Sequence, residues 1–531
     1  MLDLSRSPKA GATTTRRPIL EPHRQSAGIA VTAGVPQRVR RTGSGPDRRS
    51  VAPSSATNTI AVKAAAVGRN TSSGTWPLYR RRTNSLTSTP TISRGQDARV
   101  SLLAMLKGLT GGYDASAMAG ALLLVTDHFK LTTTQQGSLY AATAAGWIVG
   151  ALLGSRLVNT LGRRATLIWL ALLYVAATAL AVTSENLVWL DSSRFVQGTM
   201  MGVAIVAMPI LLAESASTRS RGRIAVLYQV ATSLGCAMGY LCGYLLAGGG
   251  QWRLMLAIPG VLALASTTLL IRLPETDRWR QLQQDRRADS TAEASRRPGV
   301  LRTMLSSRYR ALTLFVVTLG FFVQATGVNA IVFFSPRIFQ RIGYTDSFGL
   351  LVLPGFVQLA GAVAAFVCAL TIDRFGRRLV LLIGTALMGL GHALMVVMFA
   401  TDSPEVVGFL GLIVFIIGFN SGFGAVVWIF AAEGFPDHLR GAGASVMLLT
   451  NLTTNLFIAQ FFLDLLNAVG GMLTFLLLLA ITTLAWLFVH FLAPETKGRS
   501  LDEVQSYWEG GRSWPATGDM PDARRRPPTR A

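Results

Sequence analysis

Apolar blocks, each about twenty residues long, follow one another from near residue 102 to residue 492. A helix of that length crosses a hydrocarbon core about 30 Å thick. Because helices satisfy their own backbone polar groups, blocks this apolar can remain in lipid as helices. The blocks number twelve, at 102–127, 136–157, 165–183, 187–213, 224–248, 252–272, 311–339, 347–370, 379–400, 406–432, 442–467 and 471–492. The sequence therefore predicts an all-α membrane protein with twelve transmembrane helices.

Positive charge is distributed unevenly along the chain, whose net charge is +23. Beyond the N-terminal region, basic residues gather in alternate connections, at 162–164, 219–223, 278–310, 374–378 and Arg440. The positive-inside rule then predicts that both termini and the central loop face the cytoplasm, with the chain in the plasma membrane. Because the charge is divided among loops on one membrane face, the pattern excludes a basic nucleic-acid-binding surface.

The N-terminal segment 1–98 differs in composition from everything after it. It is rich in Ser, Thr, Ala, Arg, Gly and Pro and shows little hydrophobic periodicity, which predicts a disordered basic extension. Its Arg- and Ser-rich, acid-poor character also resembles an organellar transit peptide, which favours a plastid envelope as the alternative location. A cytoplasmic tail and a start codon placed too far upstream are the two other interpretations.

The spanning region is duplicated, because three markers recur at nearly constant spacing. They are GRR at 162–164 and 376–378, an acid followed by RG at Glu214 to Gly222 and Glu433 to Gly441, and PET at 274–276 and 494–496. The offsets of 214, 219 and 220 residues predict two homologous six-helix bundles, 99–272 and 310–493. A linker loop, 273–309, joins them, and 494–531 forms a cytoplasmic tail. Such halves hold a binding site between them near the membrane midplane.

Six motifs in order give the chain a family resemblance. They are GYD at 112–114 with Gly120, RFVQG at 194–198, RG and Gln at 221–229, GVN at 327–329, DRFGRR at 373–378 and PETKGRSLDE at 494–503. Together they cover about residues 101–508 and resemble the sugar porters of the major facilitator superfamily. The resemblance implies the major facilitator fold and secondary transport of a neutral sugar or polyol by alternating access.

The first predicted transmembrane helix contains an acidic residue, Asp114, which is costly in free energy to place in the membrane. An Asp at the centre of a spanning helix costs roughly 2.5–3.5 kcal/mol, so Asp114 must be neutral, paired or hydrated. The resemblance implies that Asp114 takes up the coupled proton and that Arg194 tunes this uptake, which favours proton symport. Asp191 lies within helical pairing reach of Arg194, and Lys107 lies two turns before Asp114. A fixed ion pair, and hence uniport, is the alternative.

Substrate contacts in such a transporter are uncharged hydrogen-bonding groups and an aromatic ring, because a sugar presents neutral hydroxyls and an apolar ring face. The resemblance implies five such residues, namely Gln229, Gln324, Asn329, Trp428 and Asn451. Other positions depart from the family pattern: Val323 replaces an amide, and Phe333 and Phe334 replace tyrosines. Fewer polar partners favour a deoxy sugar, a pentose, a polyol or a less polar solute.

The charged loop motifs imply a cytoplasmic gate made of salt bridges that break as the halves move. The implied gate residues are Arg163, Arg164, Glu214, Arg221, Asp373, Arg377, Arg378, Glu433 and Arg440. Asn159 stands where the second half has Asp373, which predicts a weaker gate in the first half. The alternative for each arginine is a charge that only sets topology.

Nothing in the sequence indicates an enzyme, a cofactor or a metal site. The three cysteines lie in apolar spans without a CxxC pattern, so we expect small packing residues. The five histidines lack ligand spacing, and His392 is expected to be a packed polar group. The expected partners are a small neutral solute, a proton and the lipid bilayer, and we expect a monomer. A transporter-like nutrient sensor is a third hypothesis, which the short C-terminal tail disfavours.

Overall fold

The first half of the chain folds into six long helices, in the order that the hydrophobic blocks predict. They are α1 (Arg94–Phe129), α2 (Thr133–Leu161), α3 (Arg163–Val182), α4 (Leu187–Ser215), α5 (Arg221–Ala247) and α6 (Trp252–Ile271). A capping box begins α2, in which the Thr132 side chain accepts from the Gln135 backbone N–H and the Gln135 side chain accepts from Thr132. Gly162, at φ 98°, ends α2 and begins α3, a conformation that favours glycine.

The second half contains broken helices as well as continuous ones. Its main elements are α9 (Arg310–Ala325), α10 (Val328–Ile342), η1 (Phe348–Val352), α11 (Leu353–Phe375), α12 (Arg377–Thr401), α13 (Glu405–Ser421), α14 (Phe423–Gly434) and α15 (Asp437–Leu492). Gly327, at φ 89°, separates α9 from α10, and Gly422 separates α13 from α14. Each of these pairs forms a single crossing with a break in its middle, where backbone groups are free for other partners.

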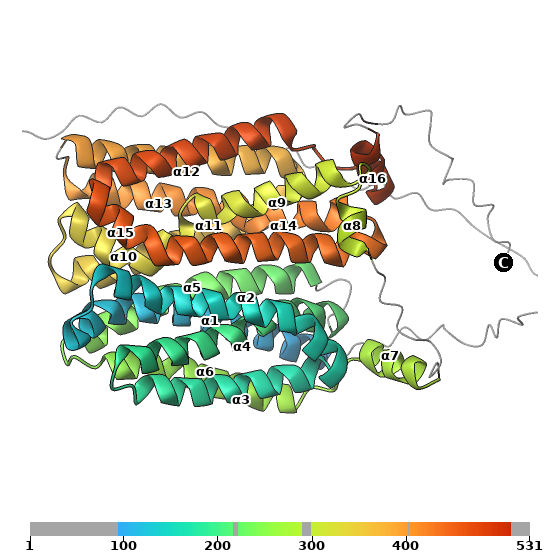
Figure 1. Cartoon of the computed structure of the whole chain (residues 1–531), viewed down its shortest axis with the longest axis horizontal. Coiled ribbons are helices and arrows are strands. Elements are labelled where there is room, and N and C mark those ends of the chain that lie inside the picture. The colour runs from blue at the N-terminus through green and yellow to red at the C-terminus, as the bar shows by residue number, and fades with distance from the viewer. Residues whose placement is uncertain (1–93, 216–220, 289–298, 402, 511–513, 515–531) are drawn as a thin grey trace, which may run out of the picture. The chain divides into compact units, whose positions relative to one another are not determined.

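The structure is a computed structural model that describes residues 94–215, 221–288, 299–401, 403–510 and 514 (Figure 1). These residues belong to one unit, 85–531. Most of the N-terminal extension inferred from the sequence, residues 1–93, lies outside the described residues. The remainder of that segment, 94–98, is helical, because α1 begins at Arg94 and not near residue 102.

Within the described residues, ten helical segments are long and apolar enough to cross a membrane. One of them, Leu439–Leu492, has 54 residues. At 1.5 Å per residue it measures about 80 Å, which is more than two membrane crossings. It turns back on itself at Gly470, at φ 81°. The two limbs of α15 and the 36-residue α1, which carries Asp114 and Lys107, complete the twelve helices that the sequence predicts. The all-α membrane fold is confirmed.

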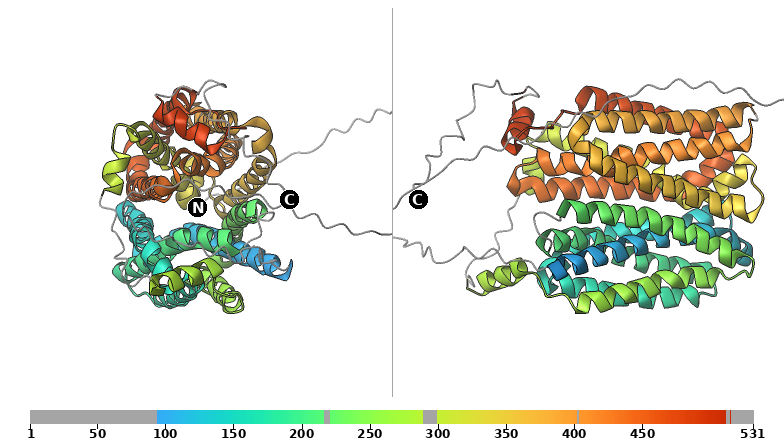
Figure 2. Two further views of the ribbon diagram at one scale, coloured as in Figure 1. Left: turned by 90° about the vertical axis from the view of Figure 1, so that its right-hand side faces the viewer. Right: turned by 180° about the vertical axis from the view of Figure 1, so that it is seen from behind.

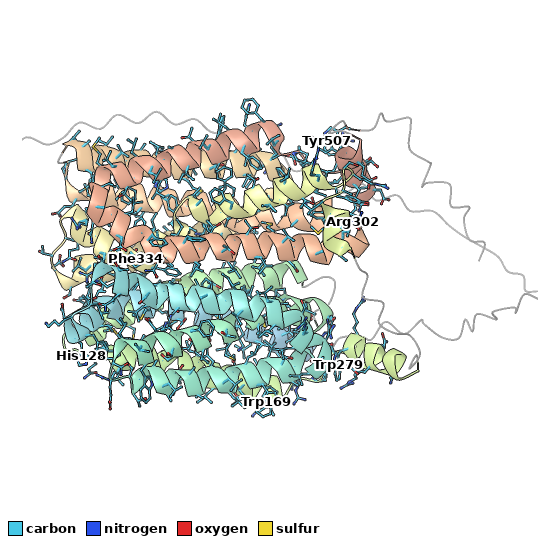
Figure 3. All side chains as sticks on the ribbon, viewed as in Figure 1. His128, Trp169, Trp279, Arg302, Phe334 and Tyr507 are labelled. Carbon is cyan, nitrogen blue, oxygen red and sulfur yellow. The ribbon has the colours of Figure 1, made fainter. Side chains whose placement is uncertain are left out.

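Each half is a helix bundle, and the two bundles lie side by side (Figures 1 and 2). In the N-terminal half α1 packs on α5 and α6, and α4 packs on α2 and α3. In the C-terminal half α15 packs on α9 and α12, and α13 packs on α11 and α12. The halves meet where α2 contacts α15, α5 contacts α11 and α1 contacts α10. Large apolar side chains such as Trp169, which is 59% exposed, point away from the bundles, as expected for lipid-facing positions (Figure 3).

The two ends of the bundle carry different elements. We call the end with Gly162 and Gly376 the motif end; it also carries the short helices α7 (Asp277–Ala288), α8 (Val300–Met304) and α16 (Leu501–Glu509). The opposite end, which we call the far end, carries the connections 130–132, 183–186, 248–251 and 343–347 and the turn at Gly470. Trp508 of α16 is 4% exposed and packs on Phe315 of α9, so the last helix is docked on the C-terminal half.

Candidate functional site

A buried ion pair joins α1 to α4 in the centre of the N-terminal half. Arg194 donates from Nη1 to Asp114 Oδ1 at 2.8 Å and from Nη2 to Asp114 Oδ2 at 3.3 Å. Asp114 is 7% exposed and Arg194 2% exposed. Gly112 lets α1 approach α5, because a Cβ there would lie 1.8 Å from the Thr232 carbonyl oxygen. The two residues that the family pattern associates with proton coupling are therefore in direct, bidentate contact.

Further polar groups complete the surroundings of this pair. Gln197, one turn after Arg194, accepts from Arg194 Nη1 at 2.8 Å and donates to Thr178 Oγ1 of α3 at 3.0 Å. Tyr174 of α3 and Tyr140 of α2 are close enough to interact electrostatically with Asp114. Neither Thr178 nor the tyrosines were identified from the sequence, because their partners lie on other helices at irregular spacing.

Neither Asp191, a possible partner of Arg194, nor Lys107, a possible partner of Asp114, takes part in the ion pair in this structure. Asp191 Oδ2 accepts from Ser138 of α2 at 2.9 Å, whereas its Oδ1 is buried without a hydrogen-bond partner. Arg194 Nε is likewise buried without a partner. Lys107 is partly exposed and makes no hydrogen bond or ion pair with any described residue. Asp114 is thus paired with Arg194 and not with Lys107.

Side-chain amides form a second polar group, in the C-terminal half. Gln324 of α9 donates from Nε2 to Asn451 Oδ1 of α15 at 3.3 Å, and Asn329 of α10 donates from Nδ2 to Asn455 Oδ1 of α15 at 2.7 Å. Gln324 Oε1, Asn451 Nδ2 and Asn455 Nδ2 are buried without partners. One acceptor and two donors are therefore available for neutral hydroxyl groups. Asn455 was missed, although its spacing of one turn after Asn451 was a usable signal.

The other two expected substrate residues are not hydrogen-bonded to these amide pairs. Gln229 of α5 is partly exposed and makes no hydrogen bond within the described part of the chain, so both ends of its amide are available. Trp428 of α14 is 40% exposed, and its ring stacks on no other described ring. Of the five residues expected to bind the substrate, Gln324 and Asn451 are hydrogen-bonded to each other, and Asn329 is hydrogen-bonded to Asn455.

Tyrosines of the N-terminal half close the far end against α10. Tyr140 donates to the Phe333 carbonyl oxygen at 2.8 Å, and its ring stacks on Phe333 with centroids 4.5 Å apart. Tyr240 of α5 donates to the Val332 carbonyl oxygen. Phe334 packs edge-on against Tyr140 and lies where the two halves meet (Figure 3). The aromatic pair of α10 that departs from the family pattern thus forms a contact between the halves.

Two arginine–glutamate ion pairs among the expected gate residues are described at the motif end, one within each half. Arg163 and Glu214 form two bonds of 3.1 Å between α3 and α4. The corresponding pair in the other half, Arg377 and Glu433, is longer, at 3.9 Å, and more exposed. The weaker first-half gate expected from Asn159 stays a prediction, because the side chain of Asp373, its second-half counterpart, lies outside the described residues.

The PET glutamates explain the third repeated marker. Glu275 accepts from the backbone N–H groups of Arg163 and Arg164 at 3.0–3.1 Å, and Glu495 accepts from those of Arg377 and Arg378 at 3.0–3.1 Å. Each carboxylate therefore caps the first turn of a helix, where free N–H groups and the helix dipole favour an anion. The repeat was visible in the sequence, but this capping contact was not.

The other residues expected in the cytoplasmic gate fall into two groups. Some have described side chains at the motif end, and the side chains of the others are not described. Arg164 donates to the Leu270 and Ile271 carbonyl oxygens at the end of α6, and Arg378 donates to that of His490. Arg440 is half-buried near the start of α15. The side chains of Arg221 and Asp373 lie outside the described residues.

Comparison with known proteins adds family information to this geometry. Residues 100–508 match the family described as "Sugar (and other) transporter". The galactose-proton symporter of Escherichia coli is 30% identical over 441 residues, which cover 78% of this chain and 94% of the relative. The arabinose-proton symporter of the same species is also 30% identical, covering 78% and 93%. The probable polyol transporter 6 of Arabidopsis thaliana is 27% identical, covering 77% and 93%.

Solved structures agree in fold. The chain is similar to the inward-open xylose transporter XylE of Escherichia coli, with a TM-score of 0.66, 24% identity and coverage of 77% of this chain and 99% of that chain. These matches confirm the family resemblance read from the six motifs. The chain is a multi-pass membrane protein and not an enzyme; it belongs to the sugar transporter family of the major facilitator superfamily.

Proposed function

We propose that this protein is a proton-coupled symporter of a neutral sugar or polyol. The observation that carries the proposal is the bidentate ion pair between Asp114 and Arg194, which is buried inside a transmembrane bundle. A buried carboxylate at that depth is expensive unless it is paired or protonated, so it is suited to alternate between the two states. The galactose- and arabinose-proton symporters, both 30% identical, support the coupling.

The proposed solute is neutral because the available polar groups of the C-terminal half are amides. Gln324 Oε1 and the Nδ2 groups of Asn451 and Asn455 can exchange hydrogen bonds with hydroxyl groups without a charge partner. Gln229 and Trp428 would extend the site from α5 and α14. Polyol and sugar transporters among the relatives support this substrate class.

Asp114 can take up a proton only when Arg194 moves away from it. Asp191 offers Arg194 a second carboxylate partner. Asp191 Oδ1 is a buried acceptor without a partner, and Arg194 Nε is a buried donor without a partner. The two residues are three positions apart on α4, hence on one helix face. Helical side chains lean toward the N-terminus, so Arg194 extends over the turn that carries Asp191. We propose that Arg194 turns to Asp191 when Asp114 is protonated.

The orientation follows from the positive-inside rule. The motif end carries the basic connections and would face the cytoplasm together with both termini. The far end, closed by Tyr140 and Tyr240, would face outward, so this conformation is the one closed to the outside. We propose a monomer in the plasma membrane.

Uptake by proteoliposomes tests the proposal. A panel of galactose, arabinose, xylose and polyols is offered with and without an inward proton gradient, with Asp114→Asn as the matched variant. We expect the gradient to drive accumulation by the wild type, and Asp114→Asn to lose accumulation while it retains solute exchange. Transport as a class is refuted if no solute moves; coupling is refuted if Asp114→Asn still accumulates solute.

Uniport is the second candidate, and it rests on the same ion pair. The two bonds at 2.8 and 3.3 Å could hold Asp114 permanently ionised beside Arg194. In that case a proton gradient would leave the steady-state solute level equal on the two sides, and Asp114→Asn would change stability without changing the driving force.

A further inference from the structure

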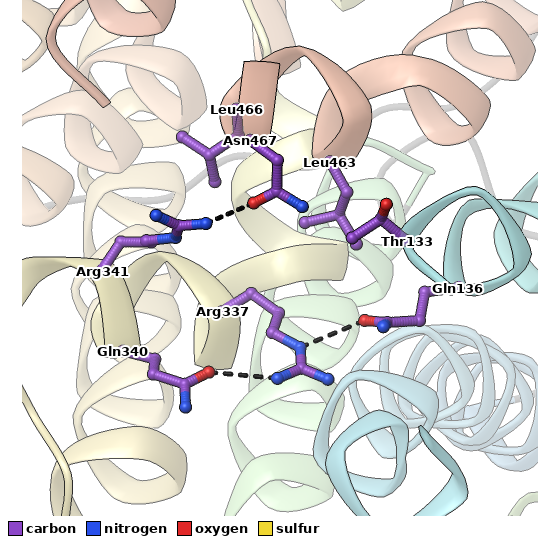
Figure 4. Close-up of a pocket in the computed structure, with 8 residues that line it drawn as sticks. All are labelled: Thr133, Gln136, Arg337, Gln340, Arg341, Leu463, Leu466 and Asn467. Atoms are coloured by element: carbon purple, nitrogen blue, oxygen red, sulfur yellow. Dashed lines mark hydrogen bonds between the residues drawn. The ribbon is translucent and has the colours of Figure 1, made fainter. Parts of the chain in front are cut away.

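A cavity of about 180 Å³ lies at the far end, where the two halves meet (Figure 4). One wall comes from α2 of the N-terminal half and the others from α10 and α15 of the C-terminal half. The lining residues are Thr133, Gln136, Arg337, Gln340, Arg341, Leu463, Leu466 and Asn467. The cavity is separate from the Asp114 pair and from the amides of the C-terminal half, and the proposed transport cycle makes no use of it.

Two guanidinium groups project toward this cavity from successive turns of α10. Arg337 donates from Nε to Gln136 Oε1 at 3.1 Å and from Nη1 to Gln340 Oε1 at 3.1 Å. Arg341 donates to Asn467 Oδ1 (Figure 4). All three acceptors are neutral amides, so they satisfy individual N–H groups and leave both positive charges uncompensated.

Neither arginine has a counter-charge in direct contact. Among the described residues, no carboxylate oxygen lies within 4.0 Å of a nitrogen of Arg337 or Arg341. Asp127 of α1 influences Arg337 only from a greater distance, and Asp464 of α15 instead accepts from Thr134 at 3.1 Å. Like charges one turn apart on a helix repel each other. Such a pair, held in a walled cavity, is the arrangement that binds an anion.

We propose that this cavity binds a small anion, a carboxylate or an oxyanion, from the solution at the far end. The guanidinium forks of Arg337 and Arg341 match the two oxygens of such a group. The volume corresponds to about six water molecules at about 30 Å³ each, which suits an anion of about that many non-hydrogen atoms. The NH₂ groups of Gln340 and Asn467, which donate to no described residue, supply further donors.

Occupancy of this site favours one conformation of the protein. Gln136 belongs to one half and Arg337 to the other, so the cavity exists only while the far end is closed. A ligand that binds one state better shifts the population toward it. The anion therefore holds the far end shut and slows turnover, whether or not transport is coupled to protons.

Thermal unfolding of the purified full-length protein in detergent tests the site. Phosphate and malonate are titrated separately at constant ionic strength against the wild type, Arg337→Gln, Arg341→Gln and the double variant. Arg272→Gln, at an exposed position near the motif end, is the matched control. We expect a saturable rise of Tm in the wild type and control, an apparent affinity at least tenfold weaker in each single variant, and no saturable rise in the double variant.

The two probes distinguish the source of the negative charge. A response to malonate alone assigns the site to an organic acid, a response to phosphate alone assigns it to an oxyanion, and either response supports the site. The proposal is overturned if neither anion raises Tm, or if all variants respond equally and without saturation, as with a general salt effect. Should the double variant not fold, Arg341→Gln decides, because Arg341 is exposed and its loss leaves the helix packing intact.

Discussion

Replacing Asp114 by Asn should destabilise the protein, because Arg194 loses the carboxylate that it contacts in this structure. The guanidinium is 2% exposed and loses the only carboxylate that it contacts among the described residues. Removing one partner of a buried ion pair costs about 3–5 kcal/mol. Asn retains the shape of Asp and one acceptor oxygen, and Gln197 still accepts from Arg194 at 2.8 Å, so we expect the lower end of that range. The double variant Asp114→Asn/Arg194→Gln removes both charges and should recover most of the loss.

The free cysteines provide the assay. Cys236 and Cys368 are buried thiols, so a thiol-reactive fluorophore reports unfolding in detergent as they become exposed. Glu185→Gln, at an exposed position near the far end, serves as the control and should leave the melting temperature unchanged.

A third variant separates the roles of the two carboxylates on either side of Arg194. If Arg194 turns to Asp191 when Asp114 is neutral, Asp191→Asn should cost more in the Asp114→Asn background than alone, by a coupling of about 1–3 kcal/mol. The reasoning is refuted if Asp114→Asn has the melting temperature of the wild type. It is also refuted if the double variant Asp114→Asn/Arg194→Gln is as unstable as Asp114→Asn. Additive effects of the two Asp→Asn changes would refute only the alternate pairing.

Other contacts give smaller effects. Loss of the helix-capping charge in Glu275→Gln should cost about 1–2 kcal/mol, measured by the same thiol assay. Arg163→Gln should lower the melting temperature, because the two bonds of Arg163 to Glu214 are 3.1 Å long and mostly buried; a melting temperature equal to that of the wild type would contradict this. The Arg308 hydrogen bond lowers the pKa of Glu509, so their contact should persist above about pH 4.3 and weaken as the pH falls through that lowered pKa. Proteolysis of α16 between pH 3 and 6 would detect this, and Arg308→Gln should remove the pH dependence.

The helices were largely predictable because hydropathy is a local property. The hydropathy of each apolar block predicts a membrane-spanning helix by itself. The repeated markers indicate the duplication, and no information on tertiary contacts is needed for either inference. The breaks within crossings were less predictable, since Gly327 and Gly422 are two glycines among 52 and only tertiary packing selects them. The turn of α15 at Gly470 is equally hard to predict, because this glycine too is selected only by tertiary packing.

The candidate site was predictable only where a residue is unusual for its surroundings. Asp114 and Arg194 were found because a charge within a span is costly. Gln197, which accepts from Arg194, and Thr178, which accepts from Gln197, are uncharged residues of apolar helices and carry no such signal. Glu275 was noticed as part of a repeat, but its partner N–H groups are more than a hundred residues away in the sequence, at Arg163. Local pattern therefore identifies the charged residues and misses the groups that orient them.

The proposed binding groups are divided between the halves, so coupling must cross the interface between them. Asp114 and Arg194 belong to the N-terminal half, whereas Asn329 and its amide neighbours belong to the C-terminal half. Tyr140 joins the halves, because it belongs to α2 of the N-terminal half and donates to the Phe333 carbonyl oxygen on α10, the helix that begins beside Asn329.

Tyr140→Phe removes that hydrogen bond and keeps the ring stack, whose planes are within 12° of parallel. The buried Phe333 carbonyl then lacks this donor, which costs about 1–3 kcal/mol in the far-closed state and favours opening. We expect weaker proton-driven accumulation with solute exchange retained, because a looser far end lets solute equilibrate without the proton step. Tyr244→Phe is the matched control, since the exposed Tyr244 side chain of α5 makes no hydrogen bond with any described residue and belongs to neither proposed site. Equal accumulation by Tyr140→Phe and the wild type would show that the link between the two sites runs elsewhere.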